Sequence, residues 1–252
     1  MNIRSRICLS LASALLVSAS YMAPAVAASY DPQALVRQAD DFRQLYPNVL
    51  MQVRLTKFVG AVQDRETLLK VAVHGSEKSL IQVIEGADRG QQVLMTAEGL
   101  WVKLPRSTRA VRITPLQRML GEASVGDIGR IRWQDDYVAR LAPDTSPGRD
   151  EATVQLELTA RSELAAYPRI NLTVAARDGC PLEATYFLKS GKALKTVSFD
   201  KPERINNRTG IRKMVFTDLL KPENRTVLVI EQSDPKTLAP RFYALETLGE
   251  WQ

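Results

Sequence analysis

Apolar and polar residues alternate with a period of two along most of the chain, the pattern of β-strands with one buried face. In NVLMQVRLTKFV, residues 48–59, every second side chain is apolar and those between are mostly polar. The stretch that follows, RETLLKVAVH, places Leu69, Val71 and Val73 on one face in the same way. The pattern predicts further strands at residues 80–84, 93–96, 100–104, 110–113, 136–141, 153–160, 170–176, 182–188, 194–199, 210–217 and 226–230.

Short turn signals separate many of these stretches, among them Gly75-Ser76, Asp178-Gly179 and Ser190-Gly191. Such turns join neighbouring strands as hairpins, so the sheet is expected to be largely antiparallel. Residues 143–150 form a polar loop, and no repeat or domain linker interrupts the pattern. A single domain over residues 28–252 is therefore expected.

One helix is expected ahead of the first strand. Asp31 can cap it, Pro32 suits its first turn, and Leu35 and Phe42 fall on one face at helical spacing. Pro47 ends the pattern.

The connection at residues 114–133 does not follow the strand pattern. It contains many apolar residues, and Gly121, Gly126 and Gly129 divide it into short pieces. We interpret it as two short helical pieces joined by a flexible hinge. Since strand-to-strand connections of this length are uncommon unless they are functional, the segment is expected to act as a lid.

Four arginines lie at the start of this connection or just before it, with no acidic residue before Glu122. One interpretation is contact with lipid phosphates or an acidic partner, for which the planar guanidinium is suited. The alternative is that charge on an edge strand prevents aggregation. The four residues are Arg106, Arg109, Arg112 and Arg118.

Residues 1–27 have the form of an export signal. Arg4 and Arg6 precede an apolar run, and Ala25-Val26-Ala27 has the small-x-small form of a cleavage site. The run is shorter than a membrane-spanning helix requires, although an uncleaved anchor stays an alternative. Without this segment Cys180 is the remaining cysteine, which excludes an intrachain disulfide.

The charge balance is mildly basic. The formal net charge is +6, and it falls to +4 without Arg4 and Arg6. A nucleic-acid-binding surface would concentrate more charge and interleave aromatic side chains, so no nucleic-acid partner is expected. In an exported protein the excess points to anionic lipid surfaces or an acidic protein, with ordinary solubility as the alternative.

The sequence offers few residues for catalysis. His74 is the only histidine, and it is expected at a strand end before a turn. HExxH, a cysteine/histidine cluster and a complete nucleophile elbow are all absent from the sequence. We therefore expect no enzyme activity, no metal and no cofactor. One alternative stays open: a hydrolase of envelope polymers, in which carboxylates distant in sequence converge in space.

A sheet with one apolar face and few helices to bury it is expected to curl. An open barrel of this kind can hold a small apolar ligand where side chains do not fill it. The alternative is a filled core.

Four stretches resemble a known family. They are GLWVKLPRSTRAVRITPLQRMLGEASVGDIGR, with a tryptophan strand, an arginine-rich strand and a Ser-x-Gly-Asp turn, then DDYVARL, LEATYFLKSGKALKTVSF and IRKMVFTDLLKPENRTVLVIEQ. In this order and spacing they resemble the LolA-like group of outer-membrane lipoprotein-sorting proteins. The resemblance implies a mainly β fold with helices (α+β), in which a strongly curved antiparallel sheet forms an incomplete barrel and helices and a lid loop cover its concave face.

The resemblance also implies a function. It is that of a monomeric periplasmic carrier that shields the acyl chains of a lipid or lipoprotein between the inner and outer membranes, with an inner-membrane transporter and an outer-membrane acceptor as further partners. A lipid-sensing regulatory module and an accessory protein of an inner-membrane lipid exporter are the alternatives. On this basis the ligand-binding residues are expected to be Leu35, Phe42, Val53, Leu55, Leu69, Val71, Trp101, Leu104, Leu116, Met119 and Leu120.

Overall fold

A computed structural model describes residues 30–114, 119–120, 123–129, 132–143, 153–163 and 165–251. The expected export signal, most of the expected polar loop, Leu116 and Arg118 lie outside the described residues. The backbone of Met119 and Leu120 is described and their side chains are not.

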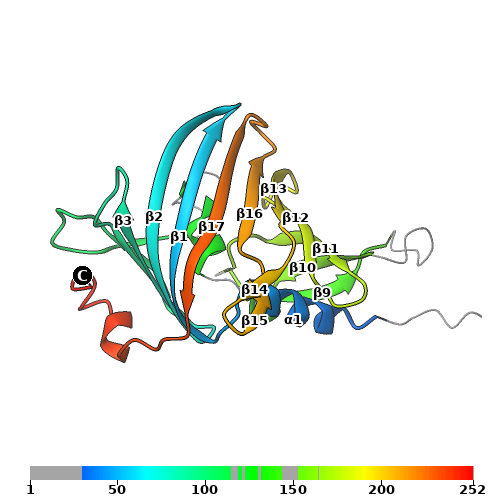
Figure 1. Ribbon diagram of the computed structural model, residues 1–252, viewed down its shortest axis with the longest axis horizontal. Helices are drawn as coiled ribbons and strands as arrows, with labels where there is room; N and C mark the ends of the chain where they lie inside the picture. The colour runs from blue at the N-terminus through cyan, green and yellow to red at the C-terminus, as the bar shows by residue number, and fades with distance from the viewer. Residues whose placement is uncertain are drawn as a thin grey trace, which may run out of the picture.

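The fold is a large, strongly curved antiparallel sheet (Figure 1). Its 13 strands follow the order β6-β5-β4-β3-β2-β1-β17-β16-β13-β12-β11-β10-β9, and each neighbouring pair is antiparallel. The edge strands β6 and β9 do not pair with each other, so the sheet is an incomplete barrel, as predicted. The strands are β1 (Asn48–Val59), β2 (Val62–His74), β3 (Lys78–Glu85), β4 (Gln92–Thr96), β5 (Gly99–Lys103), β6 (Val111–Ile113), β9 (Tyr137–Leu141), β10 (Thr153–Ala160), β11 (Arg169–Ala175), β12 (Pro181–Phe187), β13 (Ala193–Phe199), β16 (Lys213–Asp218) and β17 (Asn224–Asp234).

The predicted N-terminal helix is confirmed as α1 (Pro32–Arg43). The Asp31 carboxylate accepts hydrogen bonds from the backbone N–H groups of Gln33 and Ala34, so Asp31 caps the helix. Figure 1 shows α1 beside β9 at one end of the sheet.

The irregular connection at residues 114–133 contains short elements. They are the paired strands β7 (Met119–Leu120) and β8 (Ala123–Ser124), and the helix α2 (Val125–Gly129). The helix α3 (Trp133–Asp136) follows directly. One short helix was predicted within this connection and is confirmed as α2, whereas α3 begins at its last residue, and the strand pair was not predicted.

The main core lies on the concave face of the sheet. Neighbouring strands place Val71, Ile81 and Val93 opposite one another, and their side chains are almost fully buried. Helices α1, α2 and α3 contribute Val36, Ile128 and other residues to the same cluster. The helices therefore cover the concave face, as predicted.

A second apolar cluster lies on the opposite face of β2–β5. Ala72, Leu80 and Leu94 lie opposite one another on neighbouring strands. Each is next in sequence to a residue that points to the concave face, so its own side chain points to the other face. The C-terminal segment, which includes the 3-10 helix η1 (Pro240–Tyr243), packs on them through Tyr243, Leu248 and Trp251. This second layer was not predicted.

Two strand boundaries differ from the prediction. The expected strand at 210–217 is divided, because β15 (Arg208–Gly210) pairs with β14 (Glu203–Ile205) and the main sheet resumes at β16. β17 is longer than the expected 226–230. Within the described ranges, the longest helices fall short of what a membrane span would need in length and apolar character.

Candidate functional site

The predicted wall residues share the concave face. Leu35, Val53, Leu55, Leu69 and Val71 all belong to the main core and are 0–6% exposed. Phe42 is half-buried against the same core. These side chains are packed against neighbours, so ligand contact at them requires the covering helices to move; their role as ligand-binding residues stays a prediction.

Trp101 corrects the prediction. It lies opposite Leu94 in the β4–β5 pairing and packs with the second apolar cluster, on the face away from Leu69 and Val71. The reason is the alternation itself: Leu100 and Val102 point to the concave face, so Trp101 between them points outward. Leu104 lies beyond the end of β5 and is 50% exposed, so it is not part of the buried wall either.

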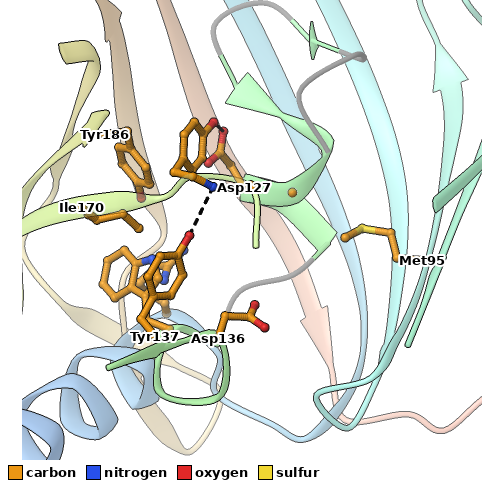
Figure 2. Close-up of a pocket in the computed structure, with 11 residues that line it drawn as sticks. Met95, Asp127, Asp136, Tyr137, Ile170 and Tyr186 are labelled. Carbon is orange, nitrogen blue, oxygen red and sulfur yellow. Dashed lines mark hydrogen bonds between the residues drawn. The ribbon is translucent and has the colours of Figure 1, made fainter. Parts of the chain in front are cut away.

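A small cavity lies on the concave side between the short helices and the sheet (Figure 2). The space inside it that the centre of a water molecule can occupy is about 20 Å³, so the cavity is nearly filled by the surrounding side chains. In Figure 2, Met95 reaches toward the cavity from one side, while Tyr137, Ile170 and Tyr186 lie on the other. Among the predicted ligand-binding residues whose side chains the structure describes, none is in its lining. The described lining residues are Arg43, Met95, Gly126, Asp127, Trp133, Asp136, Tyr137, Ala166, Tyr167, Ile170 and Tyr186.

A buried ion pair lies beside this cavity. The side chains of Asp127 in α2 and Lys195 in β13 are 4% and 2% exposed, and the Lys195 ammonium donates to Asp127 Oδ2. The same oxygen accepts from the Ser124 backbone N–H at 2.6 Å, from Ser124 Oγ at 2.9 Å and from the Tyr167 hydroxyl at 3.3 Å. The pair joins the short helix α2 to the wall of the sheet.

Aromatic rings surround the Lys195 ammonium. Its Nζ lies 5.0 Å from the ring centroid of Tyr167, 5.3 Å from that of Tyr186 and 5.1 Å from that of Phe216. Such contacts are cation–π interactions. Burial raises the pKa of both tyrosines well above the ordinary value, so their hydroxyls stay neutral hydrogen-bond donors.

A second buried pair lies at the other side of the cavity. Arg43 Nη1 is 3.4 Å from Asp40 Oδ1, and Asp40 Oδ2 accepts from the Gln134 backbone N–H at 2.8 Å. The Arg43 guanidinium lies 3.6 Å from the centroid of the Trp133 ring. Burial raises the pKa of Asp40 to about 7, against the lowering effect of Arg43. These contacts fix α3 to α1.

The arginines expected at the rim are exposed where the structure describes them. Arg106 and Arg109 lie in the connection between β5 and β6. Arg112 donates to the Glu98 carbonyl oxygen, and its guanidinium lies 5.8 Å from the Trp101 ring. None of the three forms a salt bridge with a residue of the described ranges.

The groups considered for catalysis are not arranged for it. Cys180 is buried, and burial raises the pKa of its thiol to about 11, which makes it a poor nucleophile at neutral pH. The His74 ring lies 5.5 Å from that of Tyr243 at the outer apolar cluster. Across the described residues, no group of three or more metal-ligating side chains converges.

Sequence reasoning missed the two buried pairs. One signal was present for Lys195: it shares its strand face with Val197, and a lysine at an inward position breaks the apolar alternation. Asp127 stands in the Ser-x-Gly-Asp turn, whose chemistry the sequence alone did not reveal. Nothing in the sequence places Asp40 and Arg43 against Trp133.

Comparison with solved structures defines the class of protein. A LolA superfamily protein from Nitrosomonas europaea has a TM-score of 0.78 and 25% identity, over 86% of this chain and 99% of that chain. A DUF1329 family protein from Desulfovibrio piger has a TM-score of 0.68 and 20% identity, over 87% and 100% of the two chains. An outer membrane lipoprotein-sorting protein domain from Vibrio parahaemolyticus also has a TM-score of 0.68, with 16% identity over 86% and 98%. The protein is LolA-like.

A family model also matches the chain. The model of a family described as "Uncharacterized protein" matches residues 75–250, which is more than half of the chain, and the chain belongs to that family. A comparison with curated proteins gives no match.

Proposed function

We propose that the protein is a carrier of acyl chains, which it binds on the concave face of the sheet and shields from water between the inner and outer membranes. The observation that carries this proposal is the likeness to a LolA superfamily protein over nearly the whole of both chains. The apolar concave wall, covered by short helices instead of a further sheet, agrees with it.

The binding energy of such a carrier would come from the hydrophobic effect. Each methylene removed from water contributes about 0.8 kcal/mol, so a long acyl chain supplies enough to offset a partial opening of the core. We propose that the chain enters beside α2 and α3, where the cavity already lies, and contacts Leu69 and Val71 on the wall. Leu116, Met119 and Leu120 would contact it from the covering segment.

Cellular location and partners are part of the same proposal. We propose that residues 1–27 direct export, that the carrier acts as a single-domain monomer without catalytic activity in the periplasm, and that it exchanges cargo with an inner-membrane transporter and an outer-membrane acceptor. Arg106 and Arg109, exposed beside the edge strand, would meet phosphate head groups or an acidic partner. Exposed charge pairs are screened by salt, so binding to anionic vesicles should then weaken as salt rises.

Two measurements test the carrier proposal. Organic extracts of protein purified from the periplasm, analysed by mass spectrometry, should contain a stoichiometric acyl compound. A fluorescent fatty acid should bind the delipidated protein with one-to-one stoichiometry. A protein that carries no acyl compound and binds no probe would contradict the proposal.

A further inference from the structure

Lys195 brings a positive charge into the apolar side of the sheet. Its strand, β13, directs Lys195 and Val197 to the concave face, and both are about 1% exposed. An ammonium in such surroundings is costly unless a counter-ion and hydrogen-bond acceptors accompany it. An anion next to Lys195 therefore stabilises the folded protein.

The present anion comes from outside the sheet. Asp127 belongs to α2, a five-residue helix in the irregular connection, whereas Lys195 is fixed in the sheet. Of the groups that donate to Asp127 Oδ2, Lys195 belongs to the sheet, Tyr167 to the connection between β10 and β11, and Ser124 to the same connection as Asp127. If the Asp127 carboxylate is replaced, the Lys195 ammonium stays at the position of the carboxylate oxygen, and the Tyr167 hydroxyl, which is also 3.1 Å from Ser124 Oγ, can donate to the same position.

The cavity beside this position has apolar side chains in part of its lining. Asp127 and Tyr186 line it together with the apolar Met95 and Ile170 (Figure 2), and the charged Arg43 and Asp136 also belong to the lining. An acyl chain whose polar end lay at Lys195 would thus have its tail against apolar side chains.

We propose that Lys195 and Tyr167 form a head-group site for the carboxylate of a fatty-acid ligand, and that the Asp127 carboxylate occupies this site when no ligand is bound. The inference rests on the proposed carrier function and names its ligand class. A carboxylate fits better than a phosphate monoester, because the group now in place is itself a carboxylate, whereas a phosphate carries about −1.5 to −2 charges against one lysine.

The test measures the binding of three ligands with the same acyl chain to the full mature protein. These are palmitate, palmityl alcohol and palmitoyl lysophosphatidate, measured by displacement of a fluorescent probe. Palmitate should bind at least about tenfold more tightly than the alcohol, because a hydrogen bond to a charged group is worth about that much. Asp127→Asn removes the competing carboxylate and leaves the Lys195 ammonium without this counter-ion, so it should lower the stability of the free protein and tighten palmitate severalfold, with little effect on the alcohol.

The double variant Asp127→Asn/Lys195→Met removes both charges and should bind palmitate and the alcohol equally well. It should fold, because a buried ion pair replaced by neutral groups of similar size often leaves stability unchanged or raised. The matched control is Asp200→Asn/Lys213→Met, which removes an exposed pair 3.5 Å apart between the end of β13 and the start of β16, and it should keep the preference for palmitate.

The outcomes separate the two proposals. If wild-type protein binds palmitate and the alcohol equally and the double variant changes nothing, the head-group site is wrong and the carrier proposal stands. Lysophosphatidate could instead bind more tightly than palmitate to the wild-type protein and to the control variant, and lose this advantage in Asp127→Asn/Lys195→Met. That result would overturn the assignment of the site to a carboxylate. If none of the three ligands binds, the carrier proposal itself fails.

Discussion

Asp40 and Asp127 lie almost fully buried on the concave side of the sheet, and each contacts a buried cation. Buried ion pairs are weak contributors to stability, since desolvation offsets most of the attraction. Both pairs instead fix short helices in place: Asp40 accepts a hydrogen bond from the backbone of Gln134 in α3, and Asp127 holds α2 to β13. At the scale of residues, the covering of the concave face therefore depends on charge as well as on apolar packing.

The raised pKa of Asp40 gives a pH prediction. Its pKa is about 7 in the folded protein against an ordinary 3.8, so the stability gained by protonating Asp40 is fully present below about pH 4 and is lost as pH rises through 7. Asp40→Asn lacks this group. The free energy of unfolding of wild-type protein minus that of the variant should therefore fall by about 1–4 kcal/mol between pH 4 and pH 8.

Urea denaturation at a series of pH values measures this difference. Asp41→Asn, at an exposed position next in the chain, serves as the control for the loss of a carboxylate from the same helix. A difference for Asp40→Asn that rises with pH would contradict the assignment.

At the scale of elements, α2 packs unusually closely on the sheet. A Cβ atom at Gly129 would lie 2.6 Å from Ser79 Oγ and 2.7 Å from Met95 Sδ. Gly129→Ala should therefore push α2 away from β3 and β4, at a cost of about 1–3 kcal/mol of stability. If the helix covers a binding face, the same variant should take up a fluorescent fatty acid faster in stopped-flow measurements.

Ser79→Ala supplies the matched control for this contact. Removal of Oγ relieves one of the two overlaps, so Ser79→Ala/Gly129→Ala should recover part of the stability and part of the slow uptake. A Gly129→Ala variant that is destabilised but takes up the probe at the wild-type rate would show that α2 does not cover the entrance.

The regular elements were predictable because each follows one rule. Period-two alternation located β1, β10 and β11, and the Asp31-Pro32 start located α1. The outer layer was not predictable in this way. All five residues of β4 are buried, because both faces of that strand are covered. A strand that is apolar on both faces does not show in its sequence which segment covers which face. For the same reason Trp101 was assigned to the wrong face. The buried pairs of the candidate site join segments far apart in the chain, which local patterns do not reveal.

At the scale of the whole molecule, the C-terminal segment forms an outer layer on β2–β5 (Figure 1). The Trp251 carbonyl oxygen accepts from the side chains of Gln82 and Gln92 at 2.9 Å and 2.8 Å, and Lys103 donates to the Leu248 carbonyl oxygen at 2.8 Å. This layer lies on the opposite side of the sheet from the cavity, so the two faces have separate roles: the outer face supports the sheet and the concave face carries the candidate site.

Trp251→Ala tests this separation. Trp251 is 5% exposed, and its loss should lower the free energy of unfolding by about 2–4 kcal/mol without changing the affinity for a fatty acid. Leu245→Ala, at a position 40% exposed in the same segment, should change neither quantity measurably. An affinity that falls in Trp251→Ala while the protein stays folded would mean that the outer face takes part in binding.

The central claim is that an acyl chain binds on the concave face. A fatty acid with a photoreactive diazirine on its tail, cross-linked to the protein and located by residue-resolved mass spectrometry, tests it most directly. Adducts are expected on concave-face residues such as Met95, Leu69 and Val71. Adducts confined to outer-face residues such as Leu80, Leu94 and Trp101, or no saturable adduct at all, would contradict it.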